Sequence, residues 1–166
     1  KRFAIKEFEE ILEIDVQDHM GVRYELMATY CNLEDYDKAK NFFECEQMEY
    51  HEEDLMIVPM MTVSLMTGHI EDADFYFDLL YAKNPEFENY LKMIEQGDEE
   101  RLVAETLKVN PILFEANSMQ SLLMVFNQVV DLSQSEYYFT WLIEKYRAKR
   151  PQRHVAKKKN PELHKL

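Results

Sequence analysis

Glycine and proline are scarce in this chain, which has three glycines and five prolines among its 166 residues. Sandwiches and barrels need many turns, so this scarcity argues against an all-β fold. It also leaves no glycine-rich loop to bind a phosphate group. No apolar run reaches the roughly eighteen residues of a membrane span, and we predict no membrane partner. These absences indicate one helical domain of ordinary size.

Cysteine is also rare, because Cys31 and Cys45 are the only two. Two thiols are too few for a disulfide framework. We expect both to be reduced and buried, as is typical of a cytoplasmic protein. The opening residues, 1–6, have no secretory pattern. A cytoplasmic location is therefore the prediction.

The patterns that carry catalysis or bind metals are missing as well. Paired glutamates occur at positions 9–10, 52–53 and 99–100, but on polar helix faces or at junctions. A hydrolase instead holds its two carboxyls in an apolar cleft. The polar segment 51–54 has no zinc-ligand spacing and is interpreted as a solvated junction between helices. We therefore predict no enzyme activity, no cofactor and no metal.

Positive charge is scarce except at the end of the chain. The last 22 residues hold nine Lys and Arg against one Glu, a formal charge of +8, whereas the whole chain carries −13. The first 144 residues therefore hold ten basic and 31 acidic residues, a formal charge of −21. An acidic body of this kind repels phosphate backbones and anionic lipid, and it favours basic or apolar partners.

Apolar residues recur at helical spacing nearly throughout the chain. The segment 55–66 is apolar on almost every side, which predicts a helix buried on several faces. Gly68 and the residue before Pro85 are typical helix ends. We predict an all-α protein of about eight or nine helices in antiparallel pairs, over residues 3–15, 18–33, 36–44, 55–66, 70–84, 86–94, 99–109, 112–132 and 133–147.

A repeat of 34 residues runs through the first half of the chain. Ala39 and Ala73 are 34 positions apart, and a phenylalanine follows each alanine four positions later. Small residues let the two helices of a hairpin cross closely, and the aromatic side chain fills the space toward the next hairpin. Leu80 and Pro85 follow Ala73, and Ala4, Phe8 and Ile11 copy the spacing one period earlier. Leu26, Tyr30 and Tyr36, upstream of Ala39, stand at the offsets that the tetratricopeptide pattern assigns to Leu, Tyr and Tyr.

These positions match the tetratricopeptide pattern, and residues 1–85 resemble two repeats preceded by half of another. The resemblance implies a right-handed superhelix of antiparallel helix pairs. After Pro85 the period fails, because the next Asn-Pro pair follows 26 residues later. We expect this remainder to form a divergent C-terminal helical cap. The predicted organisation is a single repeat domain over 1–150 and a basic tail over 151–166.

In tetratricopeptide proteins the first helices of the hairpins line a concave groove that holds a peptide. The resemblance implies that the same role falls here to Tyr24, Ala28, Asn32, Leu55, Val58, Thr62 and Leu65. With acidic rims, such a groove favours a basic or apolar segment of another protein, and the chain is predicted to be a non-enzymatic adaptor. Methionines at the groove edges, such as Met27 and Met61, are interpreted either as guest contacts or as core filler.

The basic end of the chain supports a second hypothesis, that of a nucleic-acid-associated regulator. Phosphate contacts would come from Arg147, Lys149, Arg150, Arg153, Lys157, Lys158 and Lys159. Alternatively, the tail folds back on its own acidic body or on that of a neighbour. The aromatic run 137–142 lies in an amphipathic helix, so Tyr138 and Trp141 are predicted to be core rather than a base-stacking surface. Self-association is the third alternative.

Overall fold

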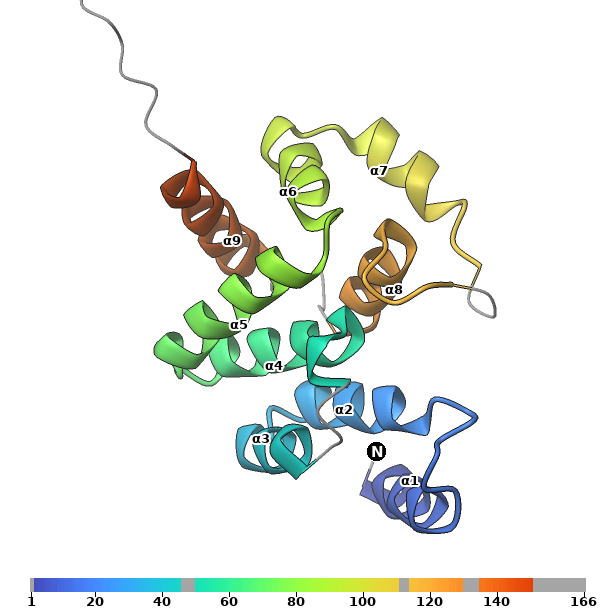
Figure 1. Cartoon of the computed structure of the whole chain (residues 1–166). Coiled ribbons are helices and arrows are strands. Elements are labelled where there is room, and N and C mark those ends of the chain that lie inside the picture. Colours follow the sequence, from blue (N-terminus) through green and yellow to red (C-terminus); the bar gives the residue numbers. More distant parts are fainter. Residues whose placement is uncertain (1, 46–49, 111–113, 130–134, 151–166) are drawn as a thin grey trace, which may run out of the picture.

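The computed structural model describes residues 2–45, 50–110, 114–129 and 135–150. Within these ranges the chain forms α-helices and one short 3₁₀ helix, with no strand, which confirms the predicted all-α fold class (Figure 1). None of the helices in these ranges is long and apolar enough to cross a membrane. In chain order the elements are α1 (Arg2–Ile14), α2 (Val22–Asn32), α3 (Tyr36–Cys45), the 3₁₀ helix η1 (Tyr50–Glu52), α4 (Asp54–Met66), α5 (Ile70–Lys83), α6 (Phe87–Gln96), α7 (Glu99–Thr106), α8 (Met119–Val129) and α9 (Ser135–Lys149).

Two helical hairpins, α2–α3 and α4–α5, form the first half of the fold. In the α4–α5 turn, Gly68 has a φ of 84°, a left-handed conformation that glycine adopts without strain. α2 and α3 both pack against α4, and α1 lies against α2 on the side away from α4 (Figure 1). Ala39 and Ala73 are both 0% exposed. Each alanine therefore sits inside the packed hairpins, as its place in the repeat predicts.

The fourth helix, α4, is the centre of the molecule. Every residue from Asp54 to Leu65 is buried, as its apolar character on all sides predicts. α5 runs along one side of α4, while α2 and α8 cover other sides (Figure 1). The interpretation of the methionines as core filler is confirmed by the four that are 0% exposed, namely Met27, Met56, Met60 and Met61.

The second half of the fold is more varied in its burial. α9 packs on α6, and its Trp141 ring meets Phe77 of α5 edge to face, with 5.7 Å between ring centroids. Tyr138 and Trp141 are buried, so the prediction that they belong to the core is confirmed. α7, in contrast, contributes no buried residue, although it packs against α6 and α8.

The predicted long helix over 112–132 is wrong at its start. Residues 114–118 form a turn, and α8 begins only at Met119. Asn117 has a left-handed φ of 59°, which does not fit a right-handed α-helix. Ser118 then caps the start of α8, because its Oγ accepts a hydrogen bond from the Ser121 N–H at 3.1 Å. The apolar spacing continues through Phe114, so periodicity alone did not reveal this turn. Residues 111–113 and 130–132 lie outside the described part of the chain.

Candidate functional site

Five of the seven residues of the predicted groove are covered by the protein itself. Ala28, Leu55, Val58, Thr62 and Leu65 are at most 4% exposed. The physical reason is α8, which packs on both α2 and α4 and buries an apolar face of its own. α9 adds to the cover, because the hydroxyls of Thr62 and Tyr138 are hydrogen-bonded at 2.9 Å. The expectation of an open face between α2 and α4 is thus corrected: α8 fills it.

The other two predicted groove residues bind neighbouring elements. Tyr24 is half-buried, and its hydroxyl donates to the Glu53 carboxylate. Burial, with help from this bond, raises the pKa of Tyr24 well above the ordinary tyrosine value. Asn32 is exposed, and its Nδ2 donates to the backbone oxygen of Gln128 in α8 at 3.2 Å. Tyr24 therefore links α2 to the start of α4, and Asn32, although exposed, links α2 to α8.

Three of the basic residues named for phosphate contacts lie at the end of α9 or directly after it, and they pair with carboxylates of the body. Arg147 Nε donates to Glu95 at 2.8 Å, Arg150 contacts the same carboxylate, and Lys149 pairs with Asp78 at 2.8 Å. The Arg147 hydrogen bond is the main cause of a lowered Glu95 pKa. The fold-back alternative therefore describes these three basic residues. The other four named for phosphate contacts, Arg153, Lys157, Lys158 and Lys159, lie outside the described residues.

The two cysteines differ, which corrects the expectation that both are buried. Cys31 is buried in α2, and burial raises the pKa of its thiol to about 12, whereas Cys45 at the end of α3 is exposed. Neither forms a disulfide. In the described part of the chain, no group of three or more His, Cys, Asp and Glu side chains is arranged to hold a metal ion.

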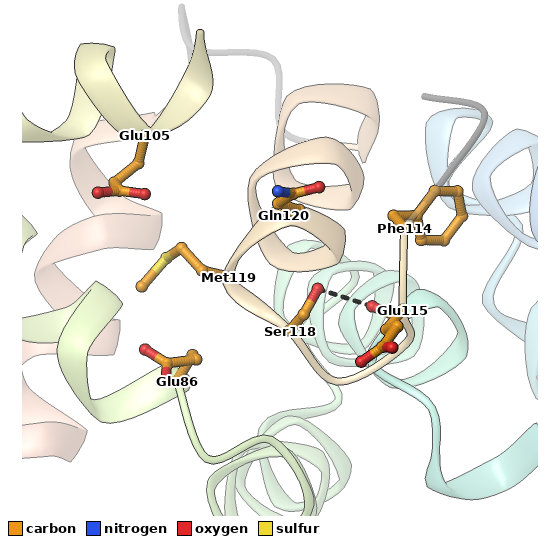
Figure 2. A pocket seen from close by; sticks show the side chains of 7 residues that line it. All are labelled: Glu86, Glu105, Phe114, Glu115, Ser118, Met119 and Gln120. Carbon is orange, nitrogen blue, oxygen red and sulfur yellow. Dashed lines mark hydrogen bonds between the residues drawn. The ribbon is translucent and has the colours of Figure 1, made fainter. Parts of the chain in front are cut away.

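The most distinctive hollow of the described surface is a cleft of about 630 Å³ among α6, α7 and the turn that leads into α8. Figure 2 shows Glu86 and Glu105 on opposite sides of the Met119 side chain, with both carboxylates turned toward the space that it enters. The residue before α6, α7 itself and the turn supply one glutamate each, so the cleft exists only in the folded chain. We call it the acidic cleft. Its lining residues are Glu86, Glu105, Phe114, Glu115, Ser118, Met119 and Gln120.

The acidic cleft combines negative charge with an apolar surface. Three of its seven described lining residues are glutamates and none is basic. Glu105 pairs with the exposed Lys108 at 2.8 Å, and Glu86 accepts from Asn89 Nδ2 at 3.0 Å. Exposed ion pairs of this kind are weak and exchange readily with other cations. The thioether of Met119 offers a soft, adaptable contact for an aliphatic chain.

Such an arrangement suits a cationic side chain with an apolar stem. Lys and Arg bury their methylene stems against apolar surface while their charged ends accept carboxylate partners. The volume of about 630 Å³ is within the range of ordinary ligand sites. Sequence reasoning expected acidic rims but missed this site. The three glutamates are 19 and 10 positions apart, so only the packing of α6, α7 and α8 brings them together.

Two of the other described hollows are less suited to a cationic guest. One, of about 540 Å³, lies beside Tyr36 and His69, whose rings stack 3.6 Å apart. Its Asp72 carboxylate is already bound by Lys40 at 2.8 Å and by the Tyr36 hydroxyl. These partners lower the Asp72 pKa, Lys40 having the larger effect, so Asp72 is ionised and paired with Lys40. A smaller hollow of about 230 Å³ between α6 and Phe139 is mainly apolar.

Known proteins offer no guide to this site. Comparison with them found no matching family model, no matching curated protein and no matching solved structure. The tetratricopeptide resemblance therefore depends on the residue spacing of the first 85 positions and stays a prediction.

Proposed function

We propose that this chain is a protein-interaction adaptor of tetratricopeptide type, and that it holds a segment of another protein by a Lys or Arg side chain placed in the acidic cleft. The proposal includes no catalytic step. It keeps the basic or apolar guest expected from the charge of the body, and it moves the contact from the face between α2 and α4 to the cleft beside α8. The helix pairs would form a right-handed superhelix that presents this cleft at its C-terminal end.

The observation that carries the proposal is the composition of the acidic cleft. Glu86, Glu105 and Glu115 all line it; Glu86 and Glu105 flank the side chain of Met119, and Glu115 lines the cleft from the far side of Ser118, next to Phe114 (Figure 2). Carboxylates from separate elements can contact one cation from several directions, and a guanidinium group offers five donors for them. An aliphatic stem packed on Met119 would exclude water from these contacts, which strengthens them.

The charge of the body supports the same guest. Residues 1–144 carry a formal charge of −21, so a basic segment is attracted over a distance comparable with the Debye length. Specific contacts in the cleft would then select among basic segments. A protein segment fits better than a free cation, because the lining has room and apolar surface for neighbouring side chains.

The test is selection of peptides from a randomised display library on the wild-type protein. We expect the selected peptides to share a Lys or Arg beside apolar residues. Binding should fall by about tenfold or more in the double variant Glu86→Gln with Glu105→Gln, since each lost charge-assisted hydrogen bond is worth roughly 1.5–3 kcal/mol.

The matched control is the double variant Glu99→Gln with Glu100→Gln. It removes the same number of negative charges from exposed positions that do not line the cleft. Glu99 is the first residue of α7 and Glu100 is the second. Retained binding in the control locates the guest in the cleft. Equal loss in both double variants, or selected peptides without Lys or Arg, would contradict the proposal.

The rival function, a nucleic-acid regulator, has less support from the described residues. Arg147, Lys149 and Arg150 are already paired with carboxylates of the body, and phosphates would have to compete with these. Salt-sensitive binding of RNA or DNA that disappears when residues 151–166 are removed would favour the rival.

A further inference from the structure

A buried carboxylate is hydrogen-bonded to residues that adjoin the lining of the acidic cleft. Asp54 opens α4 and is 0% exposed, although its place in the polar segment 51–54 led us to expect a solvated residue. Its oxygens accept from three uncharged donors, which are Ser121 Oγ at 2.6 Å, Asn84 Nδ2 at 2.8 Å and the Asn117 N–H at 3.0 Å. Burial raises the pKa of Asp54, while these hydrogen bonds act in the opposite direction.

The donor Asn84 connects Asp54 to Glu86, which forms one wall of the cleft. Asn84 is 1% exposed, and while its Nδ2 donates to Asp54, its Oδ1 accepts from the Glu86 N–H at 2.8 Å. The amide therefore fixes the backbone at Glu86 relative to the start of α4. The orientation of this amide is itself determined, because only its nitrogen can donate to a carboxylate.

The donors Asn117 and Ser121 connect Asp54 to another wall of the cleft, which is the turn before α8 that carries Glu115. Asn117 is held in both directions, since its N–H donates to Asp54 and its Oδ1 accepts from the Asp54 N–H at 2.9 Å. Ser121 Oγ also accepts from the Ser118 N–H at 2.9 Å, and Ser118 Oγ donates to the Glu115 backbone oxygen at 2.6 Å (Figure 2). Through these bonds the turn that carries Glu115 and Met119 is attached to α4.

This turn has a conformation that needs support. Asn117 has a φ of 59°, and left-handed residues other than glycine persist where their surroundings hold them. The paired hydrogen bonds with Asp54 provide that support, and Asn117 Nδ2 adds a bond to the Glu52 backbone oxygen at 3.0 Å. Asp54 accepts hydrogen bonds from both walls, and Asn84 Nδ2 adds a longer contact of 3.4 Å to the Ser118 backbone oxygen.

We infer that Asp54 is a positioning residue for peptide recognition: it sets the separation between Glu86 and the Glu115–Met119 turn, and so determines which cationic side chain the cleft accepts. The inference rests on the proposed function. Asp54 touches no guest itself, and it acts through Asn84 on one wall and through Asn117 and Ser121 on the other.

The test is a double-mutant cycle with a peptide selected on the wild-type protein as the probe. Asn84→Ala removes the link between Asp54 and the Glu86 wall. We expect the peptide Kd to rise about fivefold in this variant, as coupled neighbours commonly show. In the Glu86→Gln background the same Asn84→Ala change should have almost no further effect on Kd, because the carboxylate that the amide positions is already gone.

Stability is separated from positioning by a matched control. Ile57→Val lies one turn further along α4, at a position that is 0% exposed, and lowers stability without touching the Asp54 hydrogen bonds. Calorimetric titration gives the folded fraction from the stoichiometry and the affinity from Kd. We expect Ile57→Val to keep the wild-type Kd and Asp54→Asn to raise it; should Asp54→Asn fail to fold, Asn84→Ala carries the test.

Each result of this experiment either supports or contradicts the role inferred for Asp54. If Asn84→Ala binds with the wild-type Kd, or if its effect is the same with and without the Glu86 carboxylate, Asp54 only stabilises the fold and the inference is wrong while the proposed function stands. If no peptide is selected on the wild-type protein, the proposed function fails and the inference fails with it.

Discussion

The helices α4 and α7 are opposite cases of how a helix is held in this protein. All residues of α4 from Asp54 to Leu65 are buried, with neighbours on several sides. α7 has no buried residue, and its visible support at the start is Asp98, whose side chain accepts from the Arg101 N–H at 3.2 Å. Burial of apolar side chains therefore fixes α4, whereas a cap and partial contacts with α6 and α8 hold α7.

This difference matters because each helix contributes to the acidic cleft. α4 acts from below, where Asp54 anchors the walls that carry Glu86 and Glu115. α7 supplies Glu105 directly. Elements with few buried contacts have the lowest free energies of local opening. We therefore expect two walls of fixed geometry and a third, at α7, that adjusts to the guest.

The largest expected effect on stability is in the buried helix α4. Met61 in α4 is 0% exposed, so Met61→Ala leaves a cavity and should lower the free energy of unfolding by about 2–5 kcal/mol. Urea denaturation measures this loss. Met20→Ala is the control, since Met20 is 80% exposed and its truncation should change stability by less than about 0.5 kcal/mol. Similar losses in the two variants would contradict a core centred on α4.

A smaller effect is expected at the junction between α4 and α9. The Thr62 hydroxyl donates to the Val58 backbone oxygen, so Tyr138 is the donor in the Thr62–Tyr138 hydrogen bond. Tyr138→Phe removes that donor inside the core and should cost about 1 kcal/mol in urea denaturation.

The control for the hydroxyl is the adjacent Tyr137, which is 57% exposed. Tyr137→Phe deletes the same atom from the surface and should leave the unfolding midpoint unchanged. If Tyr138→Phe is equally neutral, α9 is held to α4 by apolar contact alone, and the polar link between these helices has no energetic role.

The sequence predicts much of the first half of the fold, because there α3 and α5 bury small and aromatic residues at regular spacing and α4 is apolar on all sides. Ala39 and Ala73 show this directly, since a small residue 34 positions from its counterpart is buried in each hairpin. The 34-residue spacing also predicted a peptide-binding groove on α2 and α4, but it did not reveal that α8 packs on these helices. Val58 is buried in α4, on which α8 packs, and α8 begins 61 positions further along the chain.

The acidic cleft was beyond sequence reasoning for a related reason. Asp54 looked like a solvated residue of a polar junction, and its burial depends on Asn117, which is 63 positions away. Local propensity treats an aspartate and an asparagine as turn residues, and it carries no information on which remote partner satisfies them. Charge composition predicts a basic guest without knowledge of any pairing, because the sum of charges can be read from the sequence alone, and this preference stays a prediction.

The smallest expected effect on global stability is at α7, and it tests whether this wall of the cleft moves separately. Asp98→Ala removes the side-chain acceptor of the Arg101 N–H, which is worth about 1 kcal/mol to the helix. Hydrogen exchange should then quicken about fivefold for the amides of α7 while those of α4 keep their protection, because α7 opens without unfolding the core. Gln96→Ala, at the exposed end of α6, should leave both sets unchanged. If Asp98→Ala speeds exchange in α4 to the same extent, α7 opens only when the whole protein unfolds, and the three walls of the cleft form one rigid unit.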